Sequence, residues 1–156
     1  MRNHAPFLAL ILAGCTILPP ATDKLETAAF DGLPPEARSY LQSISAAFGA
    51  GDKAFLLAQG ESQFEAEMRP RYDDESYLAL LFRLGRYGMD TPVEAIDLPR
   101  LAVENCTGIE YTSWREWGPV LEIRGQIRRK NEPPLPCLII LVRQLREPKI
   151  LGHFSG

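Results

Sequence analysis

The residues of this sequence best suited to chemistry are its cysteines and histidines, and they are few. The 156-residue chain contains three cysteines and two histidines. Cysteine offers a nucleophilic thiolate, whereas histidine offers a base that titrates near neutral pH or a ligand for a metal ion. No close-spaced ligand motif joins these residues, so the sequence predicts neither a zinc site nor an iron site.

The cysteine at position 15 follows a short apolar segment near the N-terminus. Arg2 precedes an apolar run from Phe7 to Ala13. A membrane-spanning helix needs about 20 apolar residues, so this run is too short to cross a bilayer. Its length is typical of the core of a signal peptide, and we therefore leave it out of the fold.

Residues Leu12-Ala13-Gly14-Cys15 resemble the lipobox of bacterial lipoprotein precursors. The small Ala13 and Gly14 give a peptidase access to the backbone, and the Cys15 thiol supplies the nucleophile that accepts a lipid. The resemblance implies that Cys15 receives a diacylglyceryl group, that cleavage removes residues 1–14, and that a fatty acid such as palmitate acylates the new amine. The alternatives are an ordinary secretory signal or a buried N-terminal helix with a chance cysteine.

The residue after the cysteine bears on the location of such a lipoprotein. In Gram-negative lipoproteins an aspartate there commonly signals retention in the inner membrane, and this chain has Thr16. The resemblance therefore implies the outer membrane, facing the periplasm. We expect a signal peptide over 1–14, a lipidated cysteine and tether over 15–32, and a single domain over 33–156. A strand or helix packed on the domain is the alternative for the tether.

The composition argues against several classes of protein. The chain is 46% hydrophobic and 24% charged. These values are ordinary for a globular domain and argue against extensive disorder or a fibrous repeat. The net charge of −3 and the pI near 5.4 argue against nucleic acid as a partner, because proteins that bind it normally carry a strong positive field.

The first half of the expected domain has the periodicity of helices. A long amphipathic helix is predicted over Leu33–Phe48, because apolar residues recur on one face and glycines follow. Asp52, Asp73 and Asp74 have the residue type that caps helices. Shorter helical segments are predicted, in chain order, over Lys53–Gln59, Glu61–Met68 and Glu75–Tyr87.

After Asp90 the apolar residues alternate with polar ones, which is typical of strands. Strands are predicted over Val93–Asp97, Leu101–Ser113, Pro119–Arg129, Pro136–Arg146 and Lys149–Phe154. The fourth of these is apolar on both faces, so we expect it to be central and covered. Helices followed by an antiparallel meander make an α+β fold.

Three features together resemble the NTF2-like superfamily, whose fold is a cystatin-like α+β cone. They are a long helix that ends in Phe48-Gly49-Ala50-Gly51-Asp52, the short helices after it, and a meander closed by residues 149–154. The resemblance implies N-terminal helices packed on a curved antiparallel sheet, with a cone-shaped cavity between them. A different α+β sheet packed on helices is the alternative. Members include isomerases, hydrolases and non-catalytic binders, so the fold alone does not assign a function.

If the cone has a cavity, aromatic and apolar side chains of both layers are the candidates to line it. These residues are Tyr40, Phe48, Tyr77, Leu81, Tyr111 and Trp114. The same residues are equally suited to fill that space as a hydrophobic core.

No set of residues identifies a catalytic centre. A general base or a nucleophile needs a partner, and His153 is the one histidine beyond the signal segment, where we expect a surface or packing role. An isomerase-like pocket would need a buried carboxylate beside a tyrosine donor. By residue type the candidates are Asp73, Asp74, Asp90 and Asp97, with Tyr72, Tyr77 or Tyr87. No spacing selects a pair, so we assign no catalytic residue and no cofactor.

Cys106 and Cys137 remain after the lipidated cysteine, and an even pair in an oxidising compartment favours a disulfide. A simple meander with Ile109 opposite Ile123 places Cys106 opposite Gln126. Cys137 then lies two strand spacings away, about 9.6 Å, whereas bonded α-carbons lie within about 6.8 Å. A bulge, or a loop position for Cys106, would permit the bond, so the pairing stays open.

The preferred function is a non-catalytic, lipid-anchored envelope protein that binds a small apolar ligand or an envelope partner. An enzyme with an isomerase-like pocket is the first alternative. The second is a scaffold subunit that forms a homodimer through the polar sheet face Glu122, Arg124, Gln126 and Arg128. The hairpin residues Arg128-Arg129-Lys130 suit either contact with anionic headgroups or a solvated tip whose charges prevent edge pairing.

Overall fold

The structure is a computed structural model that describes residues 32–85, 90–143 and 146–153. These residues form helices and one antiparallel sheet. The helices are α3 (Pro35–Ala50), α4 (Lys53–Leu57), α5 (Ser62–Met68) and α6 (Asp74–Leu81). The strands are β1 (Cys106–Trp117), β2 (Val120–Arg129), β3 (Glu132–Val142) and β4 (Lys149–Ile150). Their order in the sheet is β1-β2-β3-β4, which makes the fold α+β. The predicted signal peptide, Cys15 and the predicted tether up to position 31 lie outside the described residues.

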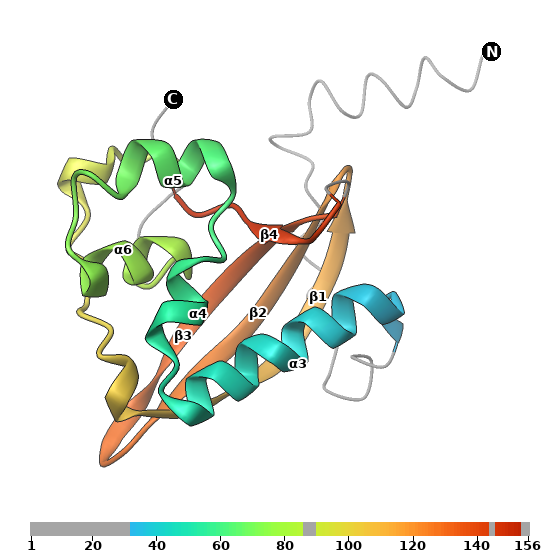
Figure 1. The fold of residues 1–156 in the computed structure, drawn as a ribbon, viewed down its shortest axis with the longest axis horizontal. Helices are drawn as coiled ribbons and strands as arrows, with labels where there is room; N and C mark the ends of the chain where they lie inside the picture. The colour runs from blue at the N-terminus through green and yellow to red at the C-terminus, as the bar shows by residue number, and fades with distance from the viewer. Residues whose placement is uncertain (1–31, 86–89, 144–145, 154–156) are drawn as a thin grey trace.

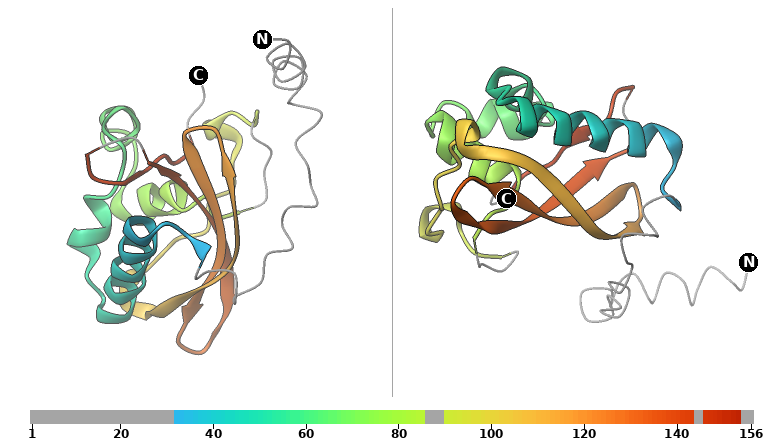
Figure 2. Two further views of the ribbon diagram at one scale, coloured as in Figure 1. Left: turned by 90° about the vertical axis from the view of Figure 1, so that its right-hand side faces the viewer. Right: turned by 90° about the horizontal axis from the view of Figure 1, so that it is seen from below.

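The helices lie on one side of a twisted sheet, and α3 runs along that side (Figure 1; Figure 2). The apolar stripe of α3 explains this placement, because Ala37, Leu41, Ile44, Ala47 and Phe48 are all buried. The helix ends at a glycine in the left-handed conformation, with φ of 69°. The long helix predicted over residues 33–48 is therefore confirmed, with a shift of two residues at each end.

The short helices begin at the caps that the sequence indicates. The Asp52 carboxylate accepts a hydrogen bond from the Phe55 amide at 3.1 Å, and Asp73 accepts one from Ser76 at 2.9 Å. Asp74 instead forms an ion pair with Arg69 at 2.9 Å. One carboxylate therefore starts α6, and its neighbour holds α6 to the end of α5.

Helix α6 ends at Leu81, six residues before the predicted end, and Tyr87 lies outside the described residues. Arg83 adopts a positive φ of 50°, which turns the chain out of the helix. The Phe82 carbonyl then accepts a hydrogen bond from the Leu138 amide of β3 at 3.0 Å. After Leu81 the chain therefore leaves the helix and forms a hydrogen bond with β3 in place of a further helical turn.

One predicted strand segment is not a strand, and another becomes a strand only after its first five residues. The segment predicted over residues 93–97 contains a 3₁₀ turn, Val93–Ala95, that follows Pro92. The segment predicted to begin at Leu101 forms a second 3₁₀ turn, Val103–Asn105, and the strand starts only at Cys106. Leu101 and Val103 are nevertheless buried, at 0% and 1% exposure. Their alternation therefore reflects burial of a loop and not a strand.

A β-bulge in β1 decides which side chains face the helices. Before the bulge between Tyr111 and Ser113, Ile109 and Tyr111 face the same side as Ile127 and Gly125 of β2. After it, Trp114 and Glu116 lie opposite Ile123 and Leu121. The extra residue shifts the alternation by one position, so it places the carboxylate of Glu116 on the side that the helices cover.

Strand β3 lies between β2 and β4, and Ile139, Ile140 and Leu141 are buried. This confirms the prediction of a covered strand. The predicted last strand is short, because only Lys149 and Ile150 pair with β3. Ile150 is also held from its other side, since it donates to the Gln59 carbonyl at 2.9 Å and accepts from the Glu61 amide at 2.8 Å.

A crowded point of the core lies where Tyr77 meets Gly60. Tyr77 is fully buried, and its hydroxyl has no hydrogen-bond partner in the described part of the chain. A methyl group at Gly60 would overlap that hydroxyl, while Phe64 Cδ2 would lie 3.4 Å away. A glycine is required at this position because the tyrosine ring occupies the space of a side chain.

We expect Gly60→Ala to lower the free energy of unfolding by about 1–3 kcal/mol, because it overpacks the core. Tyr77→Phe should be neutral or stabilising by about 1 kcal/mol, because it removes a buried hydroxyl without a partner. The double variant should recover most of the loss caused by Gly60→Ala. Urea denaturation of the four proteins measures this coupling, and strictly additive effects would show that the hydroxyl is not the obstacle.

Candidate functional site

The residues proposed to line a cone cavity lie in or against the hydrophobic core. Phe48, Tyr77 and Leu81 have 0% exposure and Tyr111 has 9%, whereas Tyr40 and Trp114 are partly buried beside them. The rings of Phe48 and Phe82 pack edge to face with centroids 5.1 Å apart. In this structure these side chains contribute to the packing between the helices and the sheet.

The hydroxyl groups of two of these tyrosines are held by hydrogen bonds. Tyr111 donates to the Leu41 carbonyl at 2.7 Å, and Tyr40 donates to Gln59 Oε1 at 2.8 Å. Burial raises the pKa of both hydroxyls, and it raises the pKa of Tyr77 to about 12. All three hydroxyls are therefore protonated at neutral pH, and the hydrogen bonds of Tyr40 and Tyr111 hold α3 in place.

The four candidate carboxylates do not gather around a tyrosine. Asp73, Asp90 and Asp97 are exposed, and Asp74 forms an ion pair with Arg69. The amide of Ser76 holds the pKa of Asp73 below its usual range. Among the described residues, no hydrogen bond joins any of these carboxylates to a tyrosine hydroxyl.

His153 is buried, with 1% exposure. Its Nε2 lies 2.8 Å from the Thr91 carbonyl, and its backbone N–H donates to the Leu80 carbonyl at 3.2 Å. Burial lowers the pKa of the imidazole below its ordinary value of 6.5. The expected packing role agrees with this position, in which the ring joins the C-terminal segment to residues 80 and 91.

The pairing of Cys106 with Cys137, which the sequence leaves open, is not formed in this structure, where both residues are buried free thiols. Cys106 lies opposite Arg129 and Cys137 lies opposite Gly125, with β2 between them. They are thus separated by two strand spacings, about 9.6 Å, and by four residues along β2, about 13 Å. Burial raises the pKa of Cys106 to about 11 and that of Cys137 to about 12.

The register explains why a bulge does not rescue this bond. The sequence-based pairing sets Ile109 opposite Ile123, but the structure sets Ile109 opposite Ile127. The bulge near Gly108 exists, yet the four-residue difference moves Cys106 farther from Cys137 along the sheet.

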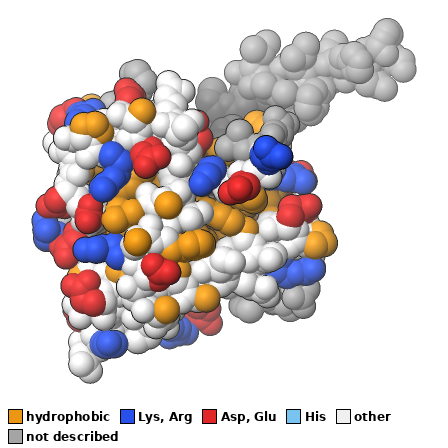
Figure 3. Space-filling view, viewed as in Figure 1, with side chains coloured by type: hydrophobic (Ala, Val, Ile, Leu, Met, Phe, Trp, Pro, Cys, Tyr) orange, Lys and Arg blue, Asp and Glu red, His pale blue; other side chains and the backbone are white. Residues whose placement is uncertain are grey.

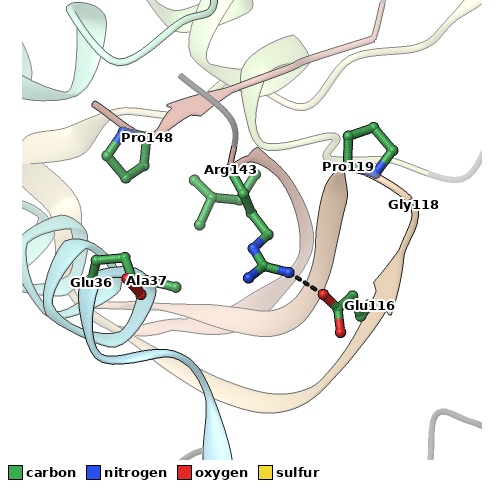
Figure 4. A pocket seen from close by; sticks show the side chains of 8 residues that line it. Glu36, Ala37, Glu116, Gly118, Pro119, Arg143 and Pro148 are labelled. Atoms are coloured by element: carbon green, nitrogen blue, oxygen red, sulfur yellow. Dashed lines mark hydrogen bonds and ion pairs between the residues drawn. The ribbon is translucent and has the colours of Figure 1, made fainter. Parts of the chain in front are cut away.

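A pocket of about 380 Å³ opens where the N-terminal end of α3 faces the end of the sheet (Figure 4). We call it the end pocket. It is lined by Glu36, Ala37, Glu116, Gly118, Pro119, Leu141, Arg143 and Pro148. Sequence reasoning missed this set, because its members come from α3, the end of β1, the β1–β2 turn, the end of β3 and the residue before β4, and no local motif connects them.

The end pocket combines an apolar floor with charged walls. Ala37 and Leu141 are buried, at 2% and 0% exposure. Arg143 extends between the walls and forms an ion pair with Glu116 (Figure 4). The Arg143 backbone N–H also donates to the Pro119 carbonyl at 3.2 Å, which ties the end of β3 to the β1–β2 turn.

A second and more open pocket of about 480 Å³ lies beside β4. It is lined by Ala58, Gly60, Ser62, Glu65, Arg146, Glu147 and Lys149. The Lys149 ammonium group donates to the Ala58 carbonyl at 3.1 Å across it. On the face of the molecule that carries α4 and β4, charged side chains interrupt the hydrophobic ones (Figure 3).

The cations at the β2–β3 hairpin tip make contacts within the chain. Arg128 pairs with Glu110, and Arg129 pairs with Glu132 at 2.7 Å. Lys130 donates to the Glu104 carbonyl at 3.4 Å. These contacts favour a solvated, self-paired tip over a surface for anionic headgroups.

The proposed dimer face has one buried member. Glu122 has 8% exposure and pairs with Arg115 at 2.5 Å, whereas Arg124, Gln126 and Arg128 are exposed. Glu122 therefore stabilises the sheet itself and is not free to contact another subunit.

Comparison with known proteins assigns no family. No protein-family model matches the chain, and neither a curated protein nor a solved structure shows significant similarity to it. Among the described residues, no helix is long and apolar enough to span a bilayer, and no cluster of histidine, cysteine and acidic side chains is arranged to hold a metal ion. The geometry of the residues is therefore the basis for a functional proposal.

We expect His153 to make the stability of the fold depend on pH. The unfolded chain binds a proton near pH 6.5, whereas the buried ring binds it only at lower pH, so stability falls as pH drops below about 6.5. His153→Gln keeps an amide N–H for the Thr91 carbonyl and removes this titration. Urea denaturation at pH 8, 6 and 5 should show a smaller loss for the variant than for the unchanged chain. Equal losses would mean that the imidazole does not titrate differently on folding.

Proposed function

We propose that this chain is a bacterial lipoprotein, anchored to the outer membrane through Cys15, whose domain binds a small ligand without catalysis. Support for the anchor comes from Leu12-Ala13-Gly14-Cys15 and from Thr16 at the sorting position. Support for ligand binding comes from the end pocket, which is the observation that carries this part of the proposal. The α+β order, with α3 packed on an antiparallel sheet, supports an NTF2-like domain.

The end pocket has the volume of a small-molecule site. Such sites usually enclose about 300–1,000 Å³, with an apolar lining and a few polar groups that orient the ligand. Here Leu141 and Ala37 supply the apolar floor, and Pro119 and Pro148 flank it. The charged groups are Glu36, Glu116 and Arg143.

An enzyme of the isomerase type is the weaker alternative. It would require a pocket carboxylate whose pKa is raised by burial. The two described carboxyl groups with a displaced pKa are Asp73 and Glu94, and both are lowered. Hydrogen bonds from backbone N–H groups are the first cause in each case, and both side chains lie on the surface.

We expect Cys15→Ser to release the protein from the membrane fraction, because serine offers no thiol for a thioether to the lipid. Cys137→Ser is the matched control, since it also removes one thiol but leaves position 15 intact. Fractionation of cells that express each form, followed by mass measurement of the N-terminal peptide, checks this. A Cys15→Ser form that remains in the membrane with an unchanged N-terminal mass would contradict lipid anchoring.

We expect the protein released gently from its own envelope to carry extra mass in a native mass spectrum, and to lose that mass on denaturation. Pro119→Trp places an indole at the rim of the end pocket and should abolish the extra mass. Pro133→Trp, at the exposed β2–β3 tip, is the matched control and should keep it. A bare monomer in every case would contradict ligand binding, and a bare dimer would favour the scaffold alternative.

A further inference from the structure

We propose that the ligand of the end pocket is a small organic cation, with an ammonium group directed at Glu36 and an apolar body on the pocket floor. This inference rests on the proposed function, because it names the chemical class of the molecule that the end pocket would hold. It follows from the charges on the pocket walls, from the partners those charges already have, and from the position of α3.

The charges on the walls do not cancel. Glu116 and Arg143 neutralise each other in an ion pair. Glu36 lies on the opposite wall, on α3, and Arg143 lies between the two carboxylates (Figure 4). Among the described residues, no ion pair or hydrogen bond engages the Glu36 side chain. One negative charge is therefore left for a ligand to neutralise.

Glu36 lies at the N-terminal end of α3, where the helix dipole is positive. Glu36 is the acidic residue in the first turn of a 16-residue helix, where the positive end of the helix dipole stabilises a carboxylate. The residues before it are Pro34 and Pro35, and Pro34 makes no side-chain cap. The positive end of this helix favours a nearby anion, and the Glu36 carboxylate already fills that role.

An anionic ligand fits the end pocket less well. It would face the carboxylates of Glu36 and Glu116 on opposite walls. To reach it, the Arg143 guanidinium would have to exchange its ion pair with Glu116 for a new partner. A cation requires no such exchange, because Glu36 is open to it and Arg143 keeps its partner.

The floor determines the rest of the ligand. Ala37 and Leu141 lie on the inner side of the pocket, and both are buried, at 2% and 0% exposure. The rings of Pro119 and Pro148 form apolar edges beside them. A hydrocarbon or aromatic body placed here loses contact with water, and the ammonium group fixes its direction.

Three probes of matched shape separate these contributions: 4-phenylbutylamine, 4-phenylbutanol and 4-phenylbutyrate. They are titrated by calorimetry at pH 7 into the full chain carrying Cys15→Ser, so that no attached lipid competes for an apolar site. We expect the amine to bind most tightly, the alcohol more weakly and the acid weakest of the three. Glu36→Gln should weaken the amine about twofold to fivefold and leave the alcohol unchanged, as expected for loss of one solvent-accessible ion pair.

Glu67→Gln is the matched control, because Glu67 is exposed on α5 and lines neither pocket. It should leave the affinity for the amine unchanged. Equal loss of affinity in the Glu67 and Glu36 variants would overturn the proposal, since it would reflect overall charge alone. If the acid bound most tightly, the selectivity would come from Arg143, and this result would also overturn the proposal.

The test separates this inference from the proposed function. If the alcohol binds, Pro119→Trp blocks it and the amine binds no better, the pocket is a ligand site but the inference about a cation is wrong. If none of the probes binds, the inference is also wrong, and the native mass spectrum then decides whether the pocket holds any ligand.

Discussion

The contact on which the rest of the structure depends is the packing of the apolar stripe of α3 on the inner side of β1 and β2. Five side chains of one helical face are buried there. Two hydrogen bonds fix α3 along the strand, from Tyr111 to the Leu41 carbonyl at 2.7 Å and from Ser45 to the Ile109 carbonyl at 3.3 Å. Hydrophobic burial supplies the attraction, and these polar contacts set the position of the helix.

The sheet adapts to α3 at one point on β1. The bulge between Tyr111 and Ser113 lies next to Gly125 of β2. A side chain at Gly125 would come within 2.8 Å of the Glu110 carbonyl, so only glycine allows the strands to approach this closely. Beyond the bulge, the inner side of the sheet carries Glu116. The same irregularity that accommodates the tyrosine therefore also supplies one wall of the end pocket.

The site and the core have different compositions for a physical reason. Between α3 and the middle of the sheet, the space is occupied by Phe48, Phe82 and Tyr111. At the N-terminal end of α3, the side chains become small or charged, and the packing stops above Leu141. The proposed ligand site at this end would leave the stabilising core intact.

The sequence by itself determined the features that depend on neighbouring residues. The period of α3, the caps at Asp52 and Asp73, the alternation of β2 and the α+β order can all be derived from short segments. The lipobox resemblance is likewise local. Only the tertiary structure decided the end of α6, the late start of β1, the separation of Cys106 from Cys137 and the residues of the end pocket. These depend on the register between strands and on hydrogen bonds such as that from Leu138 to Phe82, which join segments far apart in the chain. An alternating pattern indicates which residues are buried, but it does not indicate which other residues they pack against.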